Sequence, residues 1–406
     1  MLHSFLNALL YGLGGFLLLN CLYLLFFALA GHRRVSLPFL RHGGRSETPL
    51  YRIGVLIPAY REDAVILETA KAALRHRYEG FREVVVIADG LQPSTVQTLE
   101  RLGARVVPVH FERSTKGKAL LYALEQLPAG RYDLAVVLDA DNVMGPGCLT
   151  AINAAYAAGY RVVQTHRTAK NQDTAFAFLD ACNEEINNHI YRRGPFALGL
   201  SAALIGSGMA FDYAYLRELL QGIGETVGED KELDFRIARH RDKICYLDQV
   251  YVYDEKVDNA QTFTRQRTRW LASQLEHLRK YAAPGLGALL RDGNVEFFHK
   301  AVQTFLVPRT LLIAVLGFFC LLSVALTLLP VPLGPPVAFW AALLGLLAAA
   351  LLLALPGRLY NRQLLGAVLR LPYAIGCMCL ALLRVNRAKT AFLATPHKAA
   401  NPVLHS

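Results

Sequence analysis

Cysteines are scarce in this sequence, and none is placed to form a pair. The 406 residues contain seven cysteines, with no CxxC pair and no Cys/His spacing typical of a zinc site. This pattern disfavours a disulfide framework or a structural zinc and indicates a reducing compartment. The chain also lacks an RRM, a helix-turn-helix or an arginine-rich tail. Its net charge of +11 therefore points to an anionic lipid or substrate, and nucleic acid is not expected as a partner.

Acidic and basic side chains are missing from two long apolar segments. Residues 1–31 contain no Asp, Glu, Lys or Arg, and a helix of that length can cross a hydrocarbon core of ~30 Å. A cleaved signal peptide is the alternative, but no basic region precedes the apolar run and the run is too long. Residues 310–357 also lack charge and are interrupted by VPLGPP. This predicts two spanning helices, at roughly 308–330 and 336–356.

Basic residues flank the apolar segments and predict an orientation in the plasma or inner membrane. Four arginines follow the first segment, so the positive-inside rule places its C-terminal end in the cytoplasm and the N-terminus outside. A third apolar run, 364–383, contains Arg370 and Pro372. A span there would place the basic tail outside, so we expect an interfacial or re-entrant segment. The predicted domains are a spanning helix (1–31), a cytoplasmic domain (46–275), interfacial helices (276–307), two spanning helices (308–357), and the interfacial or re-entrant segment with its basic tail (358–406).

The segment between the apolar regions has the pattern of an α/β domain. Short apolar runs rich in β-branched residues alternate with amphipathic helical patterns, which is typical of a parallel-rich sheet that binds nucleotides. Strands are predicted at 52–60, 83–90, 104–111 and 132–142, and helices at 64–77, from Ser94, and at 117–127.

Carboxylates stand where two of these strands end. Asp139 and Asp141, in VVLDADN, follow the fourth strand, and positions i and i+2 point the same way on an extended chain. Ligands of α/β sheets bind beyond the carboxyl ends of the strands, so the two acids fit a hard divalent cation bridging a diphosphate. Asp89, in VIADG, can accept hydrogen bonds from a base or ribose. Ordinary solvated acids in a loop and a turn are the alternative.

Two further segments have a functional and a plain structural interpretation. Pro58, Tyr60 and Glu62 end the first strand, either as part of a donor site or as a simple strand exit. Lys116 and Lys118 lie at a helix start. The helix dipole disfavours cations there unless they meet an anion, which favours a phosphate contact over a solvated face.

Glycines and acids mark two more candidate segments. GSGMAFD (206–212) reads as a flexible Gly-rich loop before a helix, and its backbone at Gly206, Ser207 and Gly208 can approach a sugar or phosphate. GEDKELDFRIAR (228–239) opens a helix with Glu229 and Asp230. Acids at a helix N-terminus are stabilising in their own right, so a purely structural role stays open for this pair.

QRTRW (266–270) concentrates cations beside a tryptophan. On a helix, Gln266, Arg269 and Trp270 share one face, whereas Arg265 and Arg267 leave it. A lipid-binding patch needs cations but no such register. An amide, a guanidinium fork and a large ring on one face suit a diphosphate next to a sugar ring.

Taken in order, PAY…E, ADG, DAD, GSG, GED and QRTRW resemble the motifs of family 2 glycosyltransferases. The similarity is to the membrane-bound, inverting branch that includes cellulose, chitin, hyaluronan and poly-N-acetylglucosamine synthases. It covers about residues 51 to 275 and the flanking apolar helices. The resemblance implies a GT-A fold, Mg²⁺ or Mn²⁺, and a nucleotide-sugar donor in the cytoplasm, with a UDP-sugar favoured.

The resemblance also implies a role for each candidate residue. Asp230 is expected to be the general base, and Asp139 and Asp141 are expected to serve the metal and diphosphate. The predicted donor-binding residues are Pro58, Tyr60, Glu62, Asp89, Lys118, Gln266 and Arg269. The predicted acceptor-binding residues are Gly206, Ser207, Gly208, Glu229 and Trp270.

The sequence departs from that family in two respects. Gly228 stands where a threonine usually precedes Glu-Asp. The acceptor contact expected from that threonine side chain is therefore in question. About three spanning helices make a thin wall for a polysaccharide channel. The chain is therefore expected to form a homo-oligomer, to use an accessory export subunit, or to add one or a few sugars to a membrane-held acceptor.

The sequence as a whole predicts a metal-dependent inverting glycosyltransferase. It would form a β-linkage on a glycan or lipid-linked acceptor, for cell-surface polysaccharide synthesis. A polyprenyl-phosphate glycosyltransferase is the nearest alternative, although such enzymes usually lack QxxRW. A transporter or channel subunit would need polar residues inside the spanning helices, which are nearly bare of them. A regulatory nucleotide-binding protein is disfavoured by the intact set of acids.

Overall fold

The computed structural model describes residues 1–41, 48–226, 228–257, 259–327 and 333–384. The arginine at position 45, the first residues of the predicted cytoplasmic domain and the basic tail beyond residue 384 lie outside these ranges.

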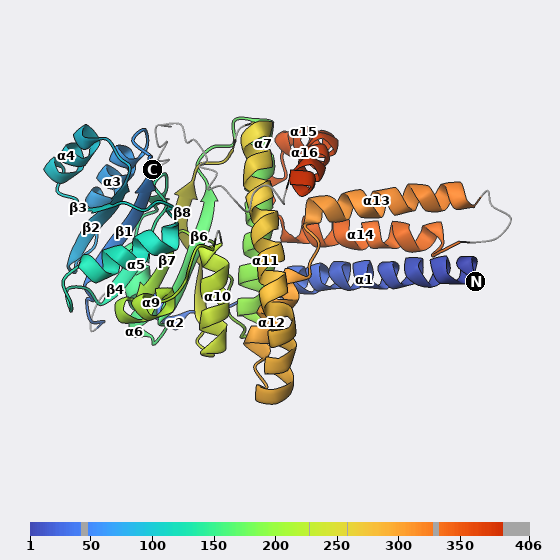
Figure 1. Cartoon of the computed structure of the whole chain (residues 1–406), viewed down its shortest axis with the longest axis horizontal. Coiled ribbons are helices and arrows are strands. Elements are labelled where there is room, and N and C mark those ends of the chain that lie inside the picture. The colour runs from blue at the N-terminus through green and yellow to red at the C-terminus, as the bar shows by residue number, and fades with distance from the viewer. Residues whose placement is uncertain (42–47, 227, 258, 328–332, 385–406) are drawn as a thin grey trace.

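An eight-stranded mixed sheet forms the centre of the α/β domain (Figure 1). Its order is β3-β2-β1-β4-β7-β6-β8-β5. In the first half of this order, β1 pairs parallel with β2 and β4, and β2 pairs parallel with β3. The predicted strands are therefore present in a mostly parallel, GT-A-like sheet. The strands are β1 (Ile53–Tyr60), β2 (Arg82–Asp89), β3 (Arg105–Val109), β4 (Leu134–Val137), β5 (Val143–Met144), β6 (Val162–Ala169), β7 (Met209–Asp212) and β8 (Ile244–Asp254).

Strand β7 corrects the expectation of a flexible loop at 206–212. In the middle of the sheet, Met209 to Asp212 pair antiparallel with β4, and Met209 to Phe211 also pair antiparallel with β6. Met209, Ala210 and Phe211 are fully buried. Four residues are too few for a periodic signal, and this strand gains its stability from neighbours that lie far away in sequence.

Amphipathic helices cover both faces of the sheet, which explains why the inner strands are apolar on both sides. One core packs Leu120, Leu216 and Leu233 of three helices against one face, and a second packs Ile66 and Leu99 against the other. The first three helices are α5 (Lys116–Gln126), α9 (Tyr213–Leu220) and α10 (Glu229–Arg239), and the second face carries α3 (Ile66–Arg75), α4 (Pro93–Arg101) and α6 (Cys148–Ala157).

Several helices lie between the sheet and the apolar helices (Figure 1). The 33-residue helix α11 begins after Asn259, whose side chain accepts a hydrogen bond from the Thr262 backbone N–H. The boundary predicted between 275 and 276 falls inside this helix, so QRTRW and the first part of the predicted interfacial segment belong to one helix. The layer contains α7 (Ala175–Asn187), a π-helix (Asn188–Arg193), α8 (Gly194–Ala197), α11 (Ala260–Asp292) and α12 (Val295–Thr304).

Three helices of the described chain are long and apolar enough to cross a membrane: α1 (Leu2–Ala30), α13 (Arg309–Leu326) and α14 (Val337–Ala354). They pack side by side around Leu17, Leu24, Leu312, Trp340 and Leu347 (Figure 1). Two shorter helices, α15 (Arg362–Leu369) and α16 (Leu371–Arg384), meet at a bend of 48°. Proline at position 372 lies at the start of the second one, where it is tolerated. Three apolar helices of this kind indicate membrane association.

Candidate active site

A cavity of about 780 Å³ lies beyond the carboxyl ends of β1, β2 and β4. This is the edge of an α/β sheet where ligands usually bind. Its walls also include the start of α10 and one face of α11. Most of the predicted site residues line it: Pro58, Tyr60, Glu62, Asp89, Asp139, Asp141, Gly206, Glu229, Asp230, Gln266, Arg269 and Trp270.

The first two strands bring their terminal residues together. Tyr60 at the end of β1 is paired in register with Asp89 at the end of β2. Asp89 is buried, and its carboxylate accepts a hydrogen bond from the Ser114 hydroxyl. The carboxylate is therefore fixed in the wall of the cavity, as expected for a group that receives hydrogen bonds from a ligand.

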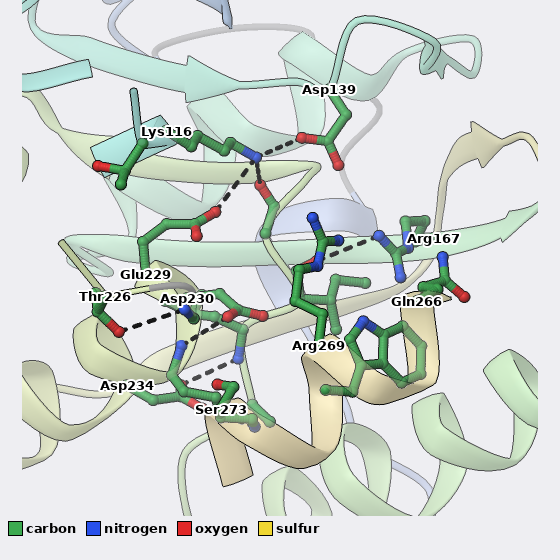
Figure 2. A pocket seen from close by; sticks show the side chains of 18 of the residues that line it. Lys116, Asp139, Arg167, Thr226, Glu229, Asp230, Asp234, Gln266, Arg269 and Ser273 are labelled. Carbon is green, nitrogen blue, oxygen red and sulfur yellow. Dashed lines mark hydrogen bonds and ion pairs between the residues drawn. The ribbon is translucent and has the colours of Figure 1, made fainter. Parts of the chain in front are cut away.

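Of the two lysines predicted at the start of α5, Lys116 lines the cavity and Lys118 does not. The Lys116 ammonium pairs with Asp139, donates to the Gly206 carbonyl at 2.5 Å and lies 3.8 Å from Glu229 (Figure 2). Burial opposes its charge, but Asp139 and Glu229 outweigh that effect and raise the pKa of Lys116. Lys118, two positions later on α5, instead pairs with Glu225 at 2.7 Å and does not line the cavity.

Two members of the GSG segment are buried in the sheet and do not line the cavity. The Ser207 hydroxyl accepts a hydrogen bond from the Asp139 backbone N–H at 3.0 Å. A side chain at Gly208, which has φ +63°, would meet the Thr165 hydroxyl at 2.3 Å. Ser207 and Gly208 therefore shape the end of β4, and among the three predicted residues only Gly206 faces the cavity.

Asp139 and Asp141 offer hard oxygen ligands at the end of β4. The Asp139 side chain is 34% exposed in the cavity. Asp141 is buried, and its carboxylate accepts a hydrogen bond from the Glu255 backbone N–H at 3.1 Å. The described residues contain no group of three or more His, Cys, Asp or Glu that could hold an ion unaided. Two carboxylates fit Mg²⁺ or Mn²⁺, because such ions commonly take their remaining oxygens from substrate phosphates and water.

The start of α10 brings a second pair of acids to the cavity. Gly206 has φ +84°, and a Cβ there would lie 3.9 Å from a Glu229 oxygen and 4.0 Å from an Asp230 oxygen. Burial raises the pKa of Glu229; Lys116 opposes this effect and Asp230 adds to it. Asp139 and Glu229, one member of each acidic pair, thus meet at Lys116 (Figure 2).

Ser273 occupies the space beside Gly228. A Cβ at position 228 would lie 2.1 Å from the Ser273 hydroxyl and 3.3 Å from a His277 ring carbon. Ser273 and His277 both line the cavity from α11. The hydroxyl of Ser273 therefore lies where a side chain at 228 would project, and the glycine is required for this close approach. Sequence reasoning missed Ser273 because only the packing of α11 on α10 brings it there.

The face of α11 lies as the helical spacing predicts. Gln266, Arg269 and Trp270 line the cavity, whereas Arg265 is exposed outside it. Arg267 is buried beside this face, where it pairs with Asp180. Its guanidinium also lies 4.0 Å from the centre of the Trp270 ring. A nonspecific lipid patch does not account for this arrangement, since one of its cations is inaccessible to lipid.

A buried network of charges forms a part of the wall that was not foreseen. Arg167 of β6 pairs with Glu184 of α7 at 2.9 Å, and Lys256 pairs with Asp254 at 2.6 Å. Burial opposes the charge of Glu184, but Arg167 and Lys256 hold its pKa well below its usual range. All four residues line the cavity. The one feature of the sequence that could have indicated this network is the presence of carboxylates in the amphipathic segment 175–187.

A GT-A-like sheet with acids, a lysine and an arginine–tryptophan face around one cavity defines a glycosyltransferase. The chain belongs to the glycosyltransferase-like family 2, whose profile matches residues 49–273. This match confirms the resemblance drawn from the motifs.

Individual relatives are distant. Hyaluronan synthase of Streptococcus pyogenes is 23% identical over 261 residues, which span 58% of this chain and 60% of that synthase. The mannosyltransferase PcManGT from Pyrobaculum calidifontis, solved with GDP-Man and Mn²⁺, has a TM-score of 0.52 at 18% identity and covers 86% of this chain and 98% of its own. Glucosyl-3-phosphoglycerate synthase from Mycobacterium tuberculosis, solved with Mn²⁺ and UDP-Glc, has a TM-score of 0.40 at 20% identity over 60% and 85% of the two chains. At such identities the structural similarity bears on the fold alone.

Proposed function

We propose that the chain is an inverting, metal-dependent glycosyltransferase acting on a glycan or membrane-held acceptor. Asp230 takes the proton from an acceptor hydroxyl, whose oxygen attacks the anomeric carbon in line with the departing nucleoside diphosphate. An α-linked donor then gives a β-linked product. Arg269 and Gln266 bind the diphosphate, Asp89 orients the nucleoside, and Trp270 packs on the acceptor sugar. A contribution to cell-surface polysaccharide synthesis is part of the same proposal.

One observation carries this proposal. The Asp139–Asp141 pair, the Glu229–Asp230 pair and the Arg269 face come from three separate elements and line a single cavity. Electrostatic stabilisation of a leaving diphosphate and general-base catalysis need such groups on two sides of one reacting centre.

Nucleotide release from a panel of UDP- and GDP-sugars tests the proposal. We expect the purified full chain in detergent to hydrolyse one donor slowly and to release nucleotide faster when the acceptor is supplied. No release from any donor would favour a transporter or a regulatory protein. Transfer to a polyprenyl phosphate without need of Asp230 would favour the polyprenyl-phosphate glycosyltransferase, whose nucleophile is already ionised.

Asp139 and Asp141 are the residues that would hold Mg²⁺ or Mn²⁺. When bound, the ion would neutralise charge on the diphosphate. We therefore expect exhaustive chelation, or Asp141→Asn, to abolish measurable turnover, and added Mn²⁺ or Mg²⁺ to restore the chelated wild type. Mn²⁺ binding followed by its paramagnetic signal should weaken in Asp141→Asn and stay unchanged in Asp173→Asn, an exposed acid outside the cavity. Full turnover after chelation would remove the metal from the mechanism.

The catalytic domain is proposed to lie in the cytoplasm, with the N-terminus outside. Support comes from the basic residues after α1 and from the need for a nucleotide sugar. Reporter fusions after Arg41 and after Gly357 should both report a cytoplasmic position, and a fusion before Leu2 should report an external one. An external reporter signal at Arg41 would reverse the orientation. Homo-oligomers or an accessory export subunit remain part of this proposal, because three spanning helices form little of a channel.

A further inference from the structure

Cations and carboxylates lie together in and behind the cavity wall next to the apolar helices. Four carboxylates there form ion pairs with cations, and Glu184 and Asp254 share both Arg167 and Lys256. The closest pairs are Arg167–Glu184 at 2.9 Å, Lys256–Asp254 at 2.6 Å, Lys300–Asp234 at 3.3 Å and Arg267–Asp180.

Two further arginines of this region, Arg192 and Arg309, lie outside these ion pairs. Arg192 is 5% exposed, and it donates to the Ala203 carbonyl and to the Asn188 side-chain oxygen, both at 3.1 Å. Arg309 donates to the Asn187 side-chain oxygen at 2.8 Å, and its Nη1 is buried without a hydrogen-bond partner. Within the part of the chain that the structure describes, neither arginine forms an ion pair with a carboxylate.

The position of these arginines connects the cavity to the membrane side of the molecule. Arg192 lines the cavity together with Asn187, Val307 and Pro308. Arg309, which is hydrogen-bonded to Asn187, is the first residue of the apolar helix α13 (Figure 1). The residues that line the cavity include none from α1, α13 or α14. The cavity wall therefore reaches the start of the apolar helices but does not continue between them.

Burying a charge without a paired counter-charge is unfavourable, and a group perturbed in this way in a cleft is a candidate for ligand binding. Burial lowers the pKa of Arg192, and the nearby Glu184 only partly offsets this effect. A bound anion would supply the missing charge, and the planar guanidinium fork suits two oxygens of a phosphate better than it suits neutral acceptors.

We propose that Arg192, supported by Arg309, binds a phosphate group carried by a membrane-held acceptor. This inference rests on the proposed function and specifies its acceptor as acidic and attached to lipid. The sugar-accepting hydroxyl would then lie toward Asp230 and Trp270, while the phosphate stays at the wall next to α13. A glycan that passes between the apolar helices needs no such site.

The test is equilibrium binding of dodecyl phosphate to the full chain in dodecyl maltoside. Saturating UDP or GDP with Mg²⁺ is present throughout, so that the diphosphate site is already filled. Arg192→Gln should raise the Kd for dodecyl phosphate by about tenfold or more, as expected when charge-assisted hydrogen bonds are lost. Arg193→Gln is the matched control, because this neighbouring arginine pairs with Asp248 at 3.2 Å and does not line the cavity.

Each outcome decides the proposal. Equal affinity in wild type and Arg192→Gln, or equal losses in Arg192→Gln and Arg193→Gln, would overturn it. Inorganic phosphate that competes as well as dodecyl phosphate would overturn the membrane-held acceptor. If Arg192→Gln does not fold, Arg192→Lys and Arg309→Gln take its place, and both should weaken dodecyl phosphate binding. Donor hydrolysis without acceptor is measured separately, so loss of this anion site and failure of the glycosyltransferase proposal give different results.

Discussion

Asp230→Asn should lower kcat by about 10²–10⁴-fold, the usual contribution of a general base. The amide keeps the size of the side chain and can still lie at the first turn of α10, but it cannot accept the proton of the acceptor hydroxyl. Donor binding should survive, because Asp230 is proposed to contact the acceptor. The measurement is transfer by the variant at saturating donor, together with the Kd of the donor.

Glu229 provides the informative comparison for this variant. It lies beside Asp230 in the same cavity, and its raised pKa makes it the alternative proton acceptor. We expect Glu229→Gln to cost less turnover than Asp230→Asn, and Asp173→Asn to cost none. A larger loss in Glu229→Gln would transfer the role of base to that residue. Loss of donor affinity in Asp230→Asn with normal turnover of bound donor would assign Asp230 to the donor instead.

Local patterns were sufficient to predict the first half of the sheet and the edge at which the cavity lies. Strands β1 to β4 are apolar runs of which the first three are each followed by a helix, so their parallel order and the position of Asp89, Asp139 and Asp141 follow from short-range rules. The face of α11 was equally accessible, because helical spacing alone separates Arg269 from Arg265.

Features that depend on distant contacts were not predictable in the same way. Strand β7 is four residues long and is defined by its partners β4 and β6. Lys116 and Lys118 are two positions apart, and only the packing of α5 decides that the first enters the cavity. Ser273 meets Gly228 across two helices. No spacing within the sequence encodes these juxtapositions.

A buried contact of Arg267 changes the effect that we expect from its substitution. The register alone predicts mild effects at both Arg265 and Arg267, because both leave the face of Arg269. The structure supports this for the exposed Arg265. Arg267, however, is buried against Asp180 and stacks on Trp270. Removing one partner of a buried ion pair typically costs about 3–5 kcal/mol, so Arg267→Ala should lower the abundance of folded protein.

For the other residues of this segment, their position on the helix still predicts the relative size of the activity loss on substitution. Arg269→Ala and Trp270→Ala should nearly abolish transfer, whereas Arg265→Ala should be mild. Arg269→Lys should not restore activity, because an ammonium group cannot reproduce the planar fork that is proposed to bind a diphosphate at two points. Trp270→Ala should impair transfer more than donor hydrolysis, since the ring is proposed to contact the acceptor.

Rates of sugar transfer and of donor hydrolysis, measured for these variants at equal abundance in the membrane, decide between a diphosphate site and a lipid-binding patch. Cations in a lipid patch are interchangeable, each contributing ~1 kcal/mol near an anionic surface. That reading predicts similar, small losses for Arg265→Ala and Arg269→Ala and full activity for Arg269→Lys. Arg267→Ala is compared only after its folded fraction has been measured, because its expected defect begins with stability. Losses of equal size at 265 and 269 would contradict the diphosphate assignment, since Arg269 lines the cavity and Arg265 does not.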